Sequence, residues 1–99
     1  METLAVGTRI FNGGDMANPE HFGTIIEVIE SKWGTDYRIQ PDQDSDRTKP
    51  YVVPKCIVSP EYSGNGSTRI VTEDAYWTWR NARIEAMKAN VLKAIGRKE

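Results

Sequence analysis

The chain has one cysteine, one histidine and no long apolar run among its 99 residues. One cysteine excludes an internal disulfide, and together with one histidine it cannot supply the usual three or four zinc ligands within a monomer. The acidic run at residues 42–46 does not match a calcium loop, because Arg47 stands at the glycine position. No metal or cofactor is therefore expected. Cys56 precedes Ile57 and Val58, so we expect it to be a buried small side chain in a reducing compartment.

The chain also lacks a large excess of charge of either sign. It holds 13 basic and 14 acidic side chains, a formal net charge of −1, too neutral for the uniformly basic field of a typical nucleic-acid-binding domain. The N-terminus has no basic region followed by an apolar run, and no stretch approaches a membrane-spanning length. A chain of this length suits one domain with one small core. We expect a single-domain cytoplasmic protein with no membrane partner.

What the sequence does contain is a series of short strand patterns separated by turn residues. These β-branched and apolar runs occupy residues 7–11, 22–29, 37–40, 51–53 and 56–58. Pro54 and Lys55 suit a single 3₁₀ turn between the last two runs. Strict alternation along the second run predicts that Ile25 and Val28 lie on opposite faces of the sheet.

Five short strands, a long first loop and a turn before the last strand resemble the SH3-like barrels, closer to the tudor and KOW kind than to any helical fold. The resemblance implies a mainly β fold with the barrel over residues 4–59. Residues 60–71 are rich in Ser, Gly and Asn, which predicts a surface loop. We expect that loop to be ordered, because Tyr62, Ile70 and Val71 can pack against the core.

Residues 72–96 predict a long C-terminal amphipathic α-helix. Thr72 can cap it, Glu73 and Asp74 favour the positive end of the helix dipole, and Gly96 can end it. Such a helix would be about 35 Å long at the usual rise per residue, longer than a small barrel is wide. We therefore expect part of it to extend beyond the barrel.

The predicted helix has an apolar face and a basic end. The apolar residues are Trp77, Ile84, Met87, Val91 and Ile95. Residues 80–99 hold six basic and two acidic side chains, a net charge of +4, whereas residues 1–79 hold seven basic and twelve acidic side chains, a net charge of −5. This asymmetry predicts that the helix packs on a second copy of the chain or contacts an anionic partner such as nucleic acid. The candidate contact residues are Trp79, Arg80, Arg83, Lys88, Lys93, Arg97 and Lys98.

Two tryptophans near the start of this helix are two positions apart, so they point about 200° apart. We expect Trp77 to join the barrel together with Ile84. Trp79 is expected to cover the loop with the sequence EYSGNG or a partner.

The segment NGGDMANPEHFG at residues 12–23 could be a catalytic loop or a recognition loop. A hydrolase would use His21 as a general base oriented by Asp15 or Glu20. The chain has no Gly-x-Ser-x-Gly nucleophile turn, however. We therefore expect no catalytic residue here and interpret the segment as a structured recognition loop.

In an SH3-like barrel this first loop lies beside the loop that joins the second and third strands. That arrangement predicts a protein-binding groove next to an exposed tryptophan. The groove would be formed by Asp15, Met16, His21, Phe22, Trp33 and Tyr37.

The segments GGDMAN, FGTI, EYSGNGSTR and TEDAYWTWR resemble a group of short, uncharacterised proteins from phages, plasmids and other mobile bacterial DNA. This resemblance implies a bacterial accessory protein without an assigned activity. The order GTRI, FGTII, YRIQ and YVVPKCI is similar to the plasmid-borne type II dihydrofolate reductases, which are SH3-like tetramers. That family carries Val-Gln-Ile-Tyr in its active pore where this chain has Tyr-Val-Val-Pro at residues 51–54, so the likeness implies the fold and not the reaction.

These observations favour a non-catalytic protein-interaction module that self-associates through its C-terminal helix. An alternative is a nucleic-acid-binding accessory protein that uses the basic helix, whose binding would weaken steeply as salt rises. A third possibility is an oligomeric enzyme whose site forms only where subunits meet.

Overall fold

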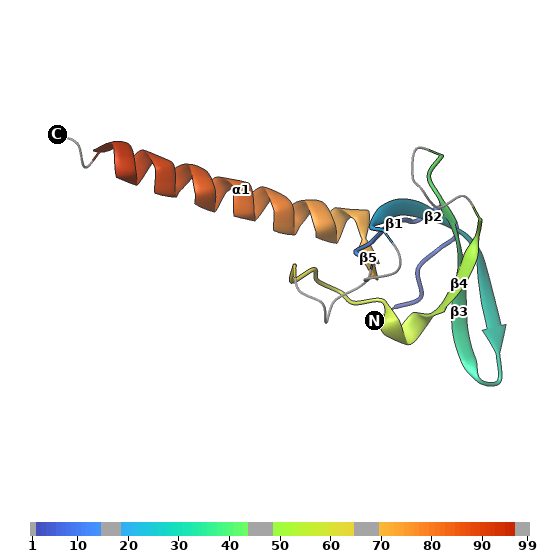
Figure 1. Ribbon diagram of the computed structural model, residues 1–99. Coiled ribbons are helices and arrows are strands. Elements are labelled where there is room, and N and C mark those ends of the chain that lie inside the picture. The colour runs from blue at the N-terminus through green and yellow to red at the C-terminus, as the bar shows by residue number, and fades with distance from the viewer. Residues whose placement is uncertain (1, 15–18, 44–48, 65–69, 97–99) are drawn as a thin grey trace.

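The computed structural model describes residues 2–14, 19–43, 49–64 and 70–96. Over these residues the protein is mainly β, with five strands followed by one long helix (Figure 1). The elements are β1 (Arg9–Asn12), β2 (His21–Ser31), β3 (Gly34–Pro41), β4 (Tyr51–Pro54), the 3₁₀ turn η1 (Lys55–Ile57), β5 (Ile70–Thr72) and α1 (Glu73–Gly96).

The strands form one antiparallel sheet in the order β4-β3-β2-β1-β5, curled into a half-barrel (Figure 1). The curl depends on β2, which pairs with β1 at one end and with β3 along most of its length. Gly23 lies where these strands approach closely, since an added Cβ would stand 2.9 Å from the Gln40 carbonyl oxygen. Glycine at this position therefore allows β2 and β3 to pack.

A β-bulge in β2 interrupts the strict alternation of side chains that the sequence predicted. The pairing shifts between Ile25 and Glu27, so Ile26 is the extra residue. Beyond the bulge Val28 packs against the same core cluster as Ile25, rather than on the opposite face. The extra residue bends the strand, which helps the sheet to curl.

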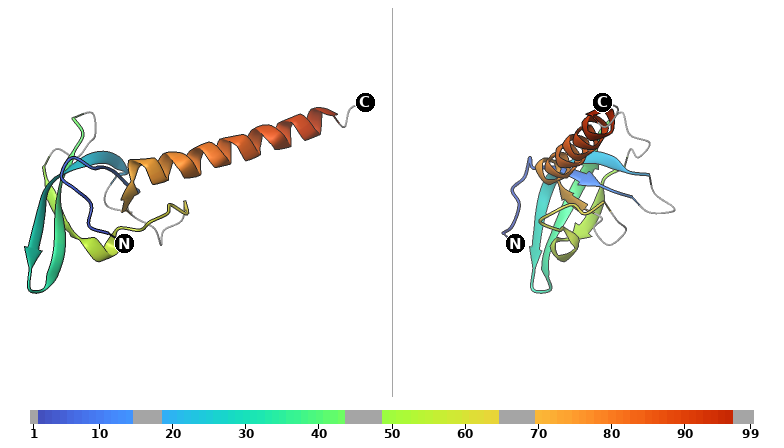
Figure 2. Two further views of the ribbon diagram at one scale, coloured as in Figure 1. Left: turned by 180° about the vertical axis from the view of Figure 1, so that it is seen from behind. Right: turned by 90° about the vertical axis from the view of Figure 1, so that its left-hand side faces the viewer.

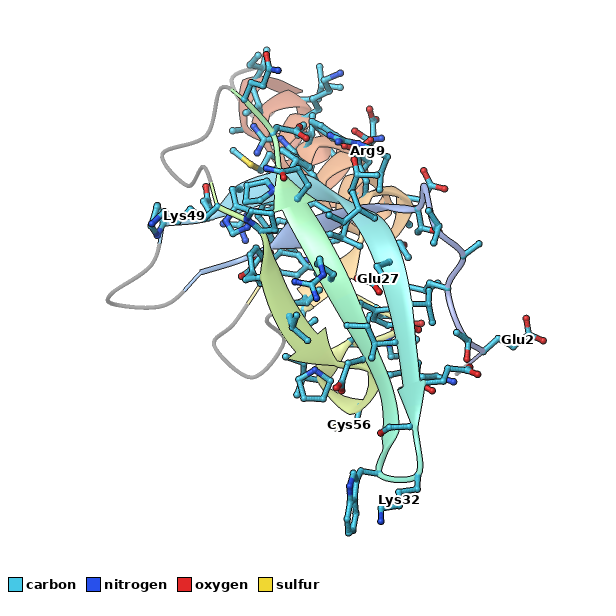
Figure 3. All side chains as sticks on the ribbon, turned by 90° about the vertical axis from the view of Figure 1, so that its right-hand side faces the viewer. Glu2, Arg9, Glu27, Lys32, Lys49 and Cys56 are labelled. Carbon is cyan, nitrogen blue, oxygen red and sulfur yellow. The ribbon has the colours of Figure 1, made fainter. Side chains whose placement is uncertain are left out.

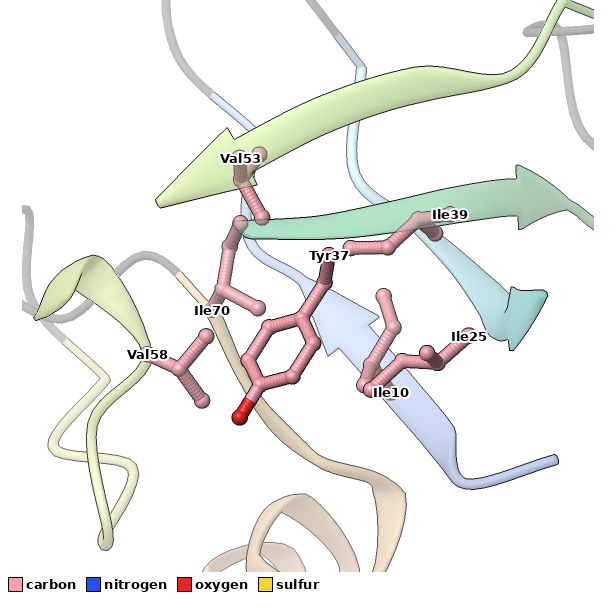
Figure 4. Packing of buried hydrophobic residues seen from close by; sticks show 7 residues of the cluster. All are labelled: Ile10, Ile25, Tyr37, Ile39, Val53, Val58 and Ile70. Carbon is pink, nitrogen blue, oxygen red and sulfur yellow. The ribbon is translucent and has the colours of Figure 1, made fainter. Parts of the chain in front are cut away.

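The concave side of the sheet holds the main core (Figure 4). Its buried residues are Ile10, Ile25, Tyr37, Ile39, Val53, Val58 and Ile70. The Tyr37 hydroxyl accepts a hydrogen bond from the Leu4 backbone N–H at 2.9 Å, so the N-terminal segment closes one side of this core. Tyr37 is therefore a core residue and does not line a surface groove.

The fifth strand differs from its predicted position. Residues 56–58 were expected to be a strand, but Lys55–Ile57 form a 3₁₀ turn and only Val58 makes an isolated bridge, to Ile70. The strand comes instead from Ile70–Thr72, which pairs with β1 and lies partly inside the predicted loop. Because the 3₁₀ turn points its side chains outward, Cys56 is exposed, and the prediction that it is buried is wrong.

The molecule is elongated because α1 projects from the half-barrel (Figure 2). Its principal extents are 64 × 29 × 24 Å and its radius of gyration is 16.9 Å, compared with about 13 Å for a compact domain of this length. The helix begins after Thr72 and ends at Gly96, as predicted. Among the described residues, none of the helices combines the length and apolar character needed to cross a membrane.

Candidate functional site

The base of α1 is fixed to the half-barrel by a cap and by an ionic contact. The Thr72 hydroxyl accepts a hydrogen bond from the Ala75 N–H at 3.2 Å, which satisfies one free donor of the first turn. Arg9 donates two hydrogen bonds to the Asp42 carboxylate at 2.6 Å and one to Glu73 at 3.3 Å. The Arg9 guanidinium thus joins β1, the end of β3 and the first residue of the helix.

This ionic contact shifts the ionisation of both main partners. The Arg9 hydrogen bonds hold the pKa of Asp42 below its usual value of 3.8, with a further contribution from the positive charge itself. The Asp42 hydrogen bond in turn raises the pKa of Arg9. Both groups stay charged over the ordinary pH range, so the contact at the helix base is present there.

Six aromatic side chains, three of them from α1 itself, pack together at the first two turns of the helix, and we call them the aromatic cluster. They are Phe11, Phe22, Tyr62, Tyr76, Trp77 and Trp79. Tyr76 is the central member, only 7% exposed and stacked on Phe11 with ring centroids 4.0 Å apart. It fills the convex side of β1 and β5, opposite the main core, so the helix base forms a second small core.

The expectation for the two tryptophans is met for Trp79 and only in part for Trp77. Trp79 packs edge-on against Tyr62 and lies so close to Gly64 that an added Cβ there would clash with its ring. It therefore covers residues 61–64, which are the described part of the EYSGNG loop, as predicted. Trp77 stacks on Phe22 but remains 41% exposed, and Ile84 is exposed rather than packed on the barrel. Tyr76, which sequence reasoning overlooked, takes the buried place.

The cluster also shifts the ionisation of one of its tyrosines. Burial raises the pKa of the Tyr62 hydroxyl above its usual value of 10.0, and the nearby charge of Glu20 adds to this effect. Tyr62 therefore stays neutral well into the alkaline range. A neutral ring suits its packing role against Trp79.

Beyond the cluster, the described side chains of α1 are exposed, although Arg80 and Arg83 reach back to the rings at the helix base. Every residue from 80 to 95 is exposed, and the views in Figures 1 and 2 show this part of the helix standing clear of the half-barrel. Apolar side chains nevertheless line one side of it. This surface, which we call the apolar stripe, consists of Trp77, Ile84, Met87, Val91, Leu92 and Ile95.

The stripe begins at the barrel and continues to the helix tip. Trp77 joins it to Phe22 of the half-barrel, and Ile84, Met87, Val91 and Leu92 continue it as an exposed apolar patch along the helix. Five of its six members were predicted from the sequence to lie on the apolar face of the helix. Leu92, at the edge of the stripe, was not among them, although it is adjacent to Val91.

The basic residues of the helix do not form one continuous face. Arg80 donates a hydrogen bond to the Tyr76 hydroxyl at 2.9 Å and lies over the Trp77 ring, while Arg83 lies over the Trp79 ring at 5.6 Å. Lys88 pairs with Glu85 at 3.6 Å. Lys93 is exposed. The remaining two predicted contact residues, Arg97 and Lys98, lie outside the described residues.

The structure does not bring the described members of the predicted groove together. His21 is the first residue of β2, whereas Trp33 lies in the turn beyond the last residue of that strand. Figure 3 shows this turn, marked by Lys32, at the outer end of the hairpin and far from Arg9. The Trp33 side chain is 86% exposed. Two other predicted members, Asp15 and Met16, lie outside the described residues.

His21 takes part in a buried polar network rather than in an exposed site. It is 4% exposed; Nδ1 lies 3.1 Å from the Pro19 carbonyl oxygen and Nε2 lies 2.8 Å from the Tyr51 hydroxyl. Because a carbonyl oxygen only accepts, Nδ1 is the donor in the first of these contacts. The third hydrogen bond of the network runs from the Asn12 side-chain amide to the Tyr51 hydroxyl oxygen at 3.2 Å. These contacts connect the ends of β1, β2 and β4.

The exposed hairpin turn borders a shallow hollow of about 420 Å³. Its lining includes Trp33, Asp36, Lys55 and Cys56, and Figure 3 shows Cys56 near the same end of the sheet as Lys32. Within the residues that the structure describes, no three His, Cys, Asp or Glu side chains gather in a metal-binding arrangement.

Comparison of the chain with protein-family models, with curated proteins and with solved structures gives no match. The resemblance to mobile-element proteins and the finer SH3-like assignment therefore stay predictions. The apolar stripe and the aromatic cluster beneath it are the surface that the geometry itself singles out.

Proposed function

We propose that this protein is a non-catalytic protein-interaction module in which a small SH3-like barrel holds an interaction helix out into solvent. The observation that carries this proposal is the run of exposed residues from 80 to 95, with apolar side chains along one side. A helix gains most of its stability from packing its apolar face. The exposed stripe is therefore best explained as a surface that a protein partner covers.

The contrast with the helix base supports this function. The aromatic cluster, the Thr72 cap and the Arg9 contact fix the direction in which the helix leaves the barrel. A rigid mount reduces the entropy that a partner must overcome on binding. The barrel in this proposal is a support that presents the helix, and the proposed contact surface moves from the predicted groove to the stripe.

The sheet order supports the finer assignment of the barrel. A meander of β1 to β4, a 3₁₀ turn at Lys55–Ile57 and a last strand that pairs with β1 are the arrangement expected of an SH3-like fold. The departure is the long connection between the turn and β5. An experimental structure that closes the half-barrel around the same strand order would support the assignment, and a flat open sheet would contradict it.

A nucleic-acid-binding function is the second candidate, and the charge of the helix favours it. Residues 80–95 hold four basic side chains and one acidic side chain. Two of the arginines lie over tryptophan rings, however, and Lys88 pairs with Glu85, so these groups are partly engaged. Titration with labelled duplex DNA and with RNA at two salt concentrations would separate the candidates, since phosphate-driven binding weakens steeply with salt.

The test of the interaction function compares three full-length proteins as bait. One is the natural chain, one carries Met87→Glu and Val91→Glu in the stripe, and the control carries Ala86→Glu and Ala89→Glu on the exposed opposite side. We expect a protein partner to bind the natural chain and the control, and not to bind the variant with Met87→Glu and Val91→Glu. Equal binding by all three proteins would contradict a role for the stripe.

A further inference from the structure

The apolar stripe has a periodicity that suits pairing with another helix. Trp77, Ile84 and Val91 recur every seven residues, and Met87 and Ala94 each follow three residues after Ile84 and Val91. These are the two apolar positions of a heptad, which place one seam along the helix. All of these residues except Ala94 belong to the stripe, and Ala94 is itself exposed.

Charges along α1 distinguish the two directions in which a second helix could lie. The first turn holds Glu73 and Asp74, whereas Lys93, Arg97 and Lys98 follow toward the C-terminal end of the chain. An antiparallel partner places the acidic turn of one helix near the basic end of the other, and it also opposes the two helix dipoles favourably. A parallel partner would place Arg83 of one helix beside Lys88 of the other at flanking heptad positions.

We propose that the partner of the apolar stripe is a second copy of this chain, whose α1 lies antiparallel to the first. This inference rests on the proposed interaction function and names the partner of the same surface. Of the heptad registers, we take the one that pairs the most layers: Ile84 meets the partner's Met87, Arg80 meets the partner's Val91, and Trp77 meets the partner's Ala94. The large Trp77 ring thus lies opposite a small side chain.

The charge of the whole chain agrees with this arrangement. Residues 1–79 carry a net charge of −5 and residues 80–99 a net charge of +4. In the antiparallel register the tip of each helix comes level with the base of the other, so each basic tip approaches the acidic half-barrel of its partner. Phe22 lies beside Trp77 at that base, which extends the apolar contact from the helix to the barrel.

The size of a stable interface also requires two contacts, one between the helices and one between each helix tip and the partner's half-barrel. The part of α1 from Trp77 to Ile95 is about 27 Å long and about 10 Å wide, so half its lateral surface is about 400 Å². An ordinary stable interface buries about 800 Å² on each partner. Helix pairing alone falls short of that value, and the additional contact between each tip and the partner's base makes up the difference.

The first experiment measures the mass of the full chain in solution by sedimentation over a dilution series. We expect a dimer that dissociates on dilution. The stripe variant with Met87→Glu and Val91→Glu should associate at least about 100-fold more weakly, because carboxylates would be buried against apolar side chains. The control with Ala86→Glu and Ala89→Glu changes the charge by the same amount and should associate like the natural chain.

The second experiment determines the direction of the two helices by cross-linking single cysteines. With Cys56→Ser as the background, one chain carries Arg80→Cys and the other Val91→Cys, and a short bis-maleimide reagent is added. Antiparallel helices should cross-link only when the two chains are mixed. Parallel helices would cross-link within each chain type alone, which would overturn the proposed arrangement.

The results separate this inference from the function on which it rests. A natural chain that stays monomeric at every concentration overturns the second-copy proposal, while a different protein that binds the natural chain and not the stripe variant would leave the interaction function standing. A dimer that the stripe variant and the control form equally well would also overturn it, because its interface would then lie elsewhere. Circular dichroism of each variant shows whether the helix is retained.

Discussion

The two parts of α1 share one continuous backbone and have opposite surroundings. Its first two turns contribute Tyr76 and Trp79 to a compact cluster of rings, whereas residues 80–95 are exposed on all sides. Aromatic and apolar residues occur in both parts, so composition does not distinguish them. The chain's own folding explains the base, whereas the projecting part leaves exposed the apolar side chains that the proposed partner would cover.

The largest expected effect comes from removing the ring at the centre of the base. Tyr76→Ala should lower the free energy of unfolding by about 3 kcal/mol, because it leaves a cavity between Phe11 and the helix. The melting temperature should fall by roughly 15 °C for a domain of this size. Urea and thermal unfolding would measure both quantities.

Trp33→Ala is the matched control for that substitution. The ring is equally aromatic but 86% exposed in the hairpin turn, so its loss should change stability by no more than about 0.5 kcal/mol. If the two substitutions had similar effects, the aromatic cluster would not be the anchor of the helix.

A smaller effect is expected where the loop meets the helix. Gly64 has a φ of +76°, and a Cβ added there would lie against the Trp79 ring. A left-handed conformation alone costs a non-glycine residue about 1–2 kcal/mol. Gly64→Ala should therefore lower the free energy of unfolding by more than this amount. Gly7→Ala is the control, since Gly7 has a φ of +94° but no atom within 4 Å of the added Cβ. Equal losses of stability for the two variants would mean that the loop does not press on Trp79.

The stability that the ionic contact at the helix base contributes should depend on pH. Because its pKa is lowered in the folded protein, Asp42 contributes stability that is present above its unfolded-state pKa of about 3.9 and is lost as pH falls through the lower folded value. Asp42→Asn should cost about 1 kcal/mol near neutral pH, a size typical of a partly exposed pair. The difference between the natural chain and the variant should shrink below about pH 4.

Urea unfolding of both proteins at several pH values would measure this change. Glu27→Gln is a suitable control, because Glu27 pairs with Arg38 on the exposed face of the sheet and not with the helix. A constant difference between natural chain and D42N through the acid range would contradict the assignment of the lowered pKa to the Arg9 contact.

The ends and the length of the helix could be predicted from the sequence because they depend on local residues. Thr72, the acidic first turn and Gly96 determine its ends, and their effects depend on neighbours within a few residues. The long projection also followed from length alone. Which aromatic ring turns toward the barrel did not follow, since Tyr76 and Trp77 are adjacent and only the position of Phe11 decides between them.

The sheet was less readable, because its errors arise from contacts between distant segments. The β-branched run from Ile70 to Thr72 is a strand signal of only three residues, and its pairing with β1 is what makes it a strand. Cys56 has strand-like neighbours but follows Pro54 in a 3₁₀ turn. The described members of the predicted groove lie apart for a similar reason, since β2 is long enough to place His21 and Trp33 at opposite ends of the strand and its turn.

The smallest expected effect comes from a substitution in the projecting part of α1. Val91→Ala removes an apolar side chain that is 57% exposed, and alanine is the better helix former by a few tenths of a kcal/mol. In a dilute monomer the free energy of unfolding should therefore stay within about 0.5 kcal/mol of the natural value. At concentrations where the stripe is covered, the same substitution should lower the melting temperature, because it then removes a buried contact. A loss of stability that is the same at all concentrations would mean that Val91 already packs within its own chain.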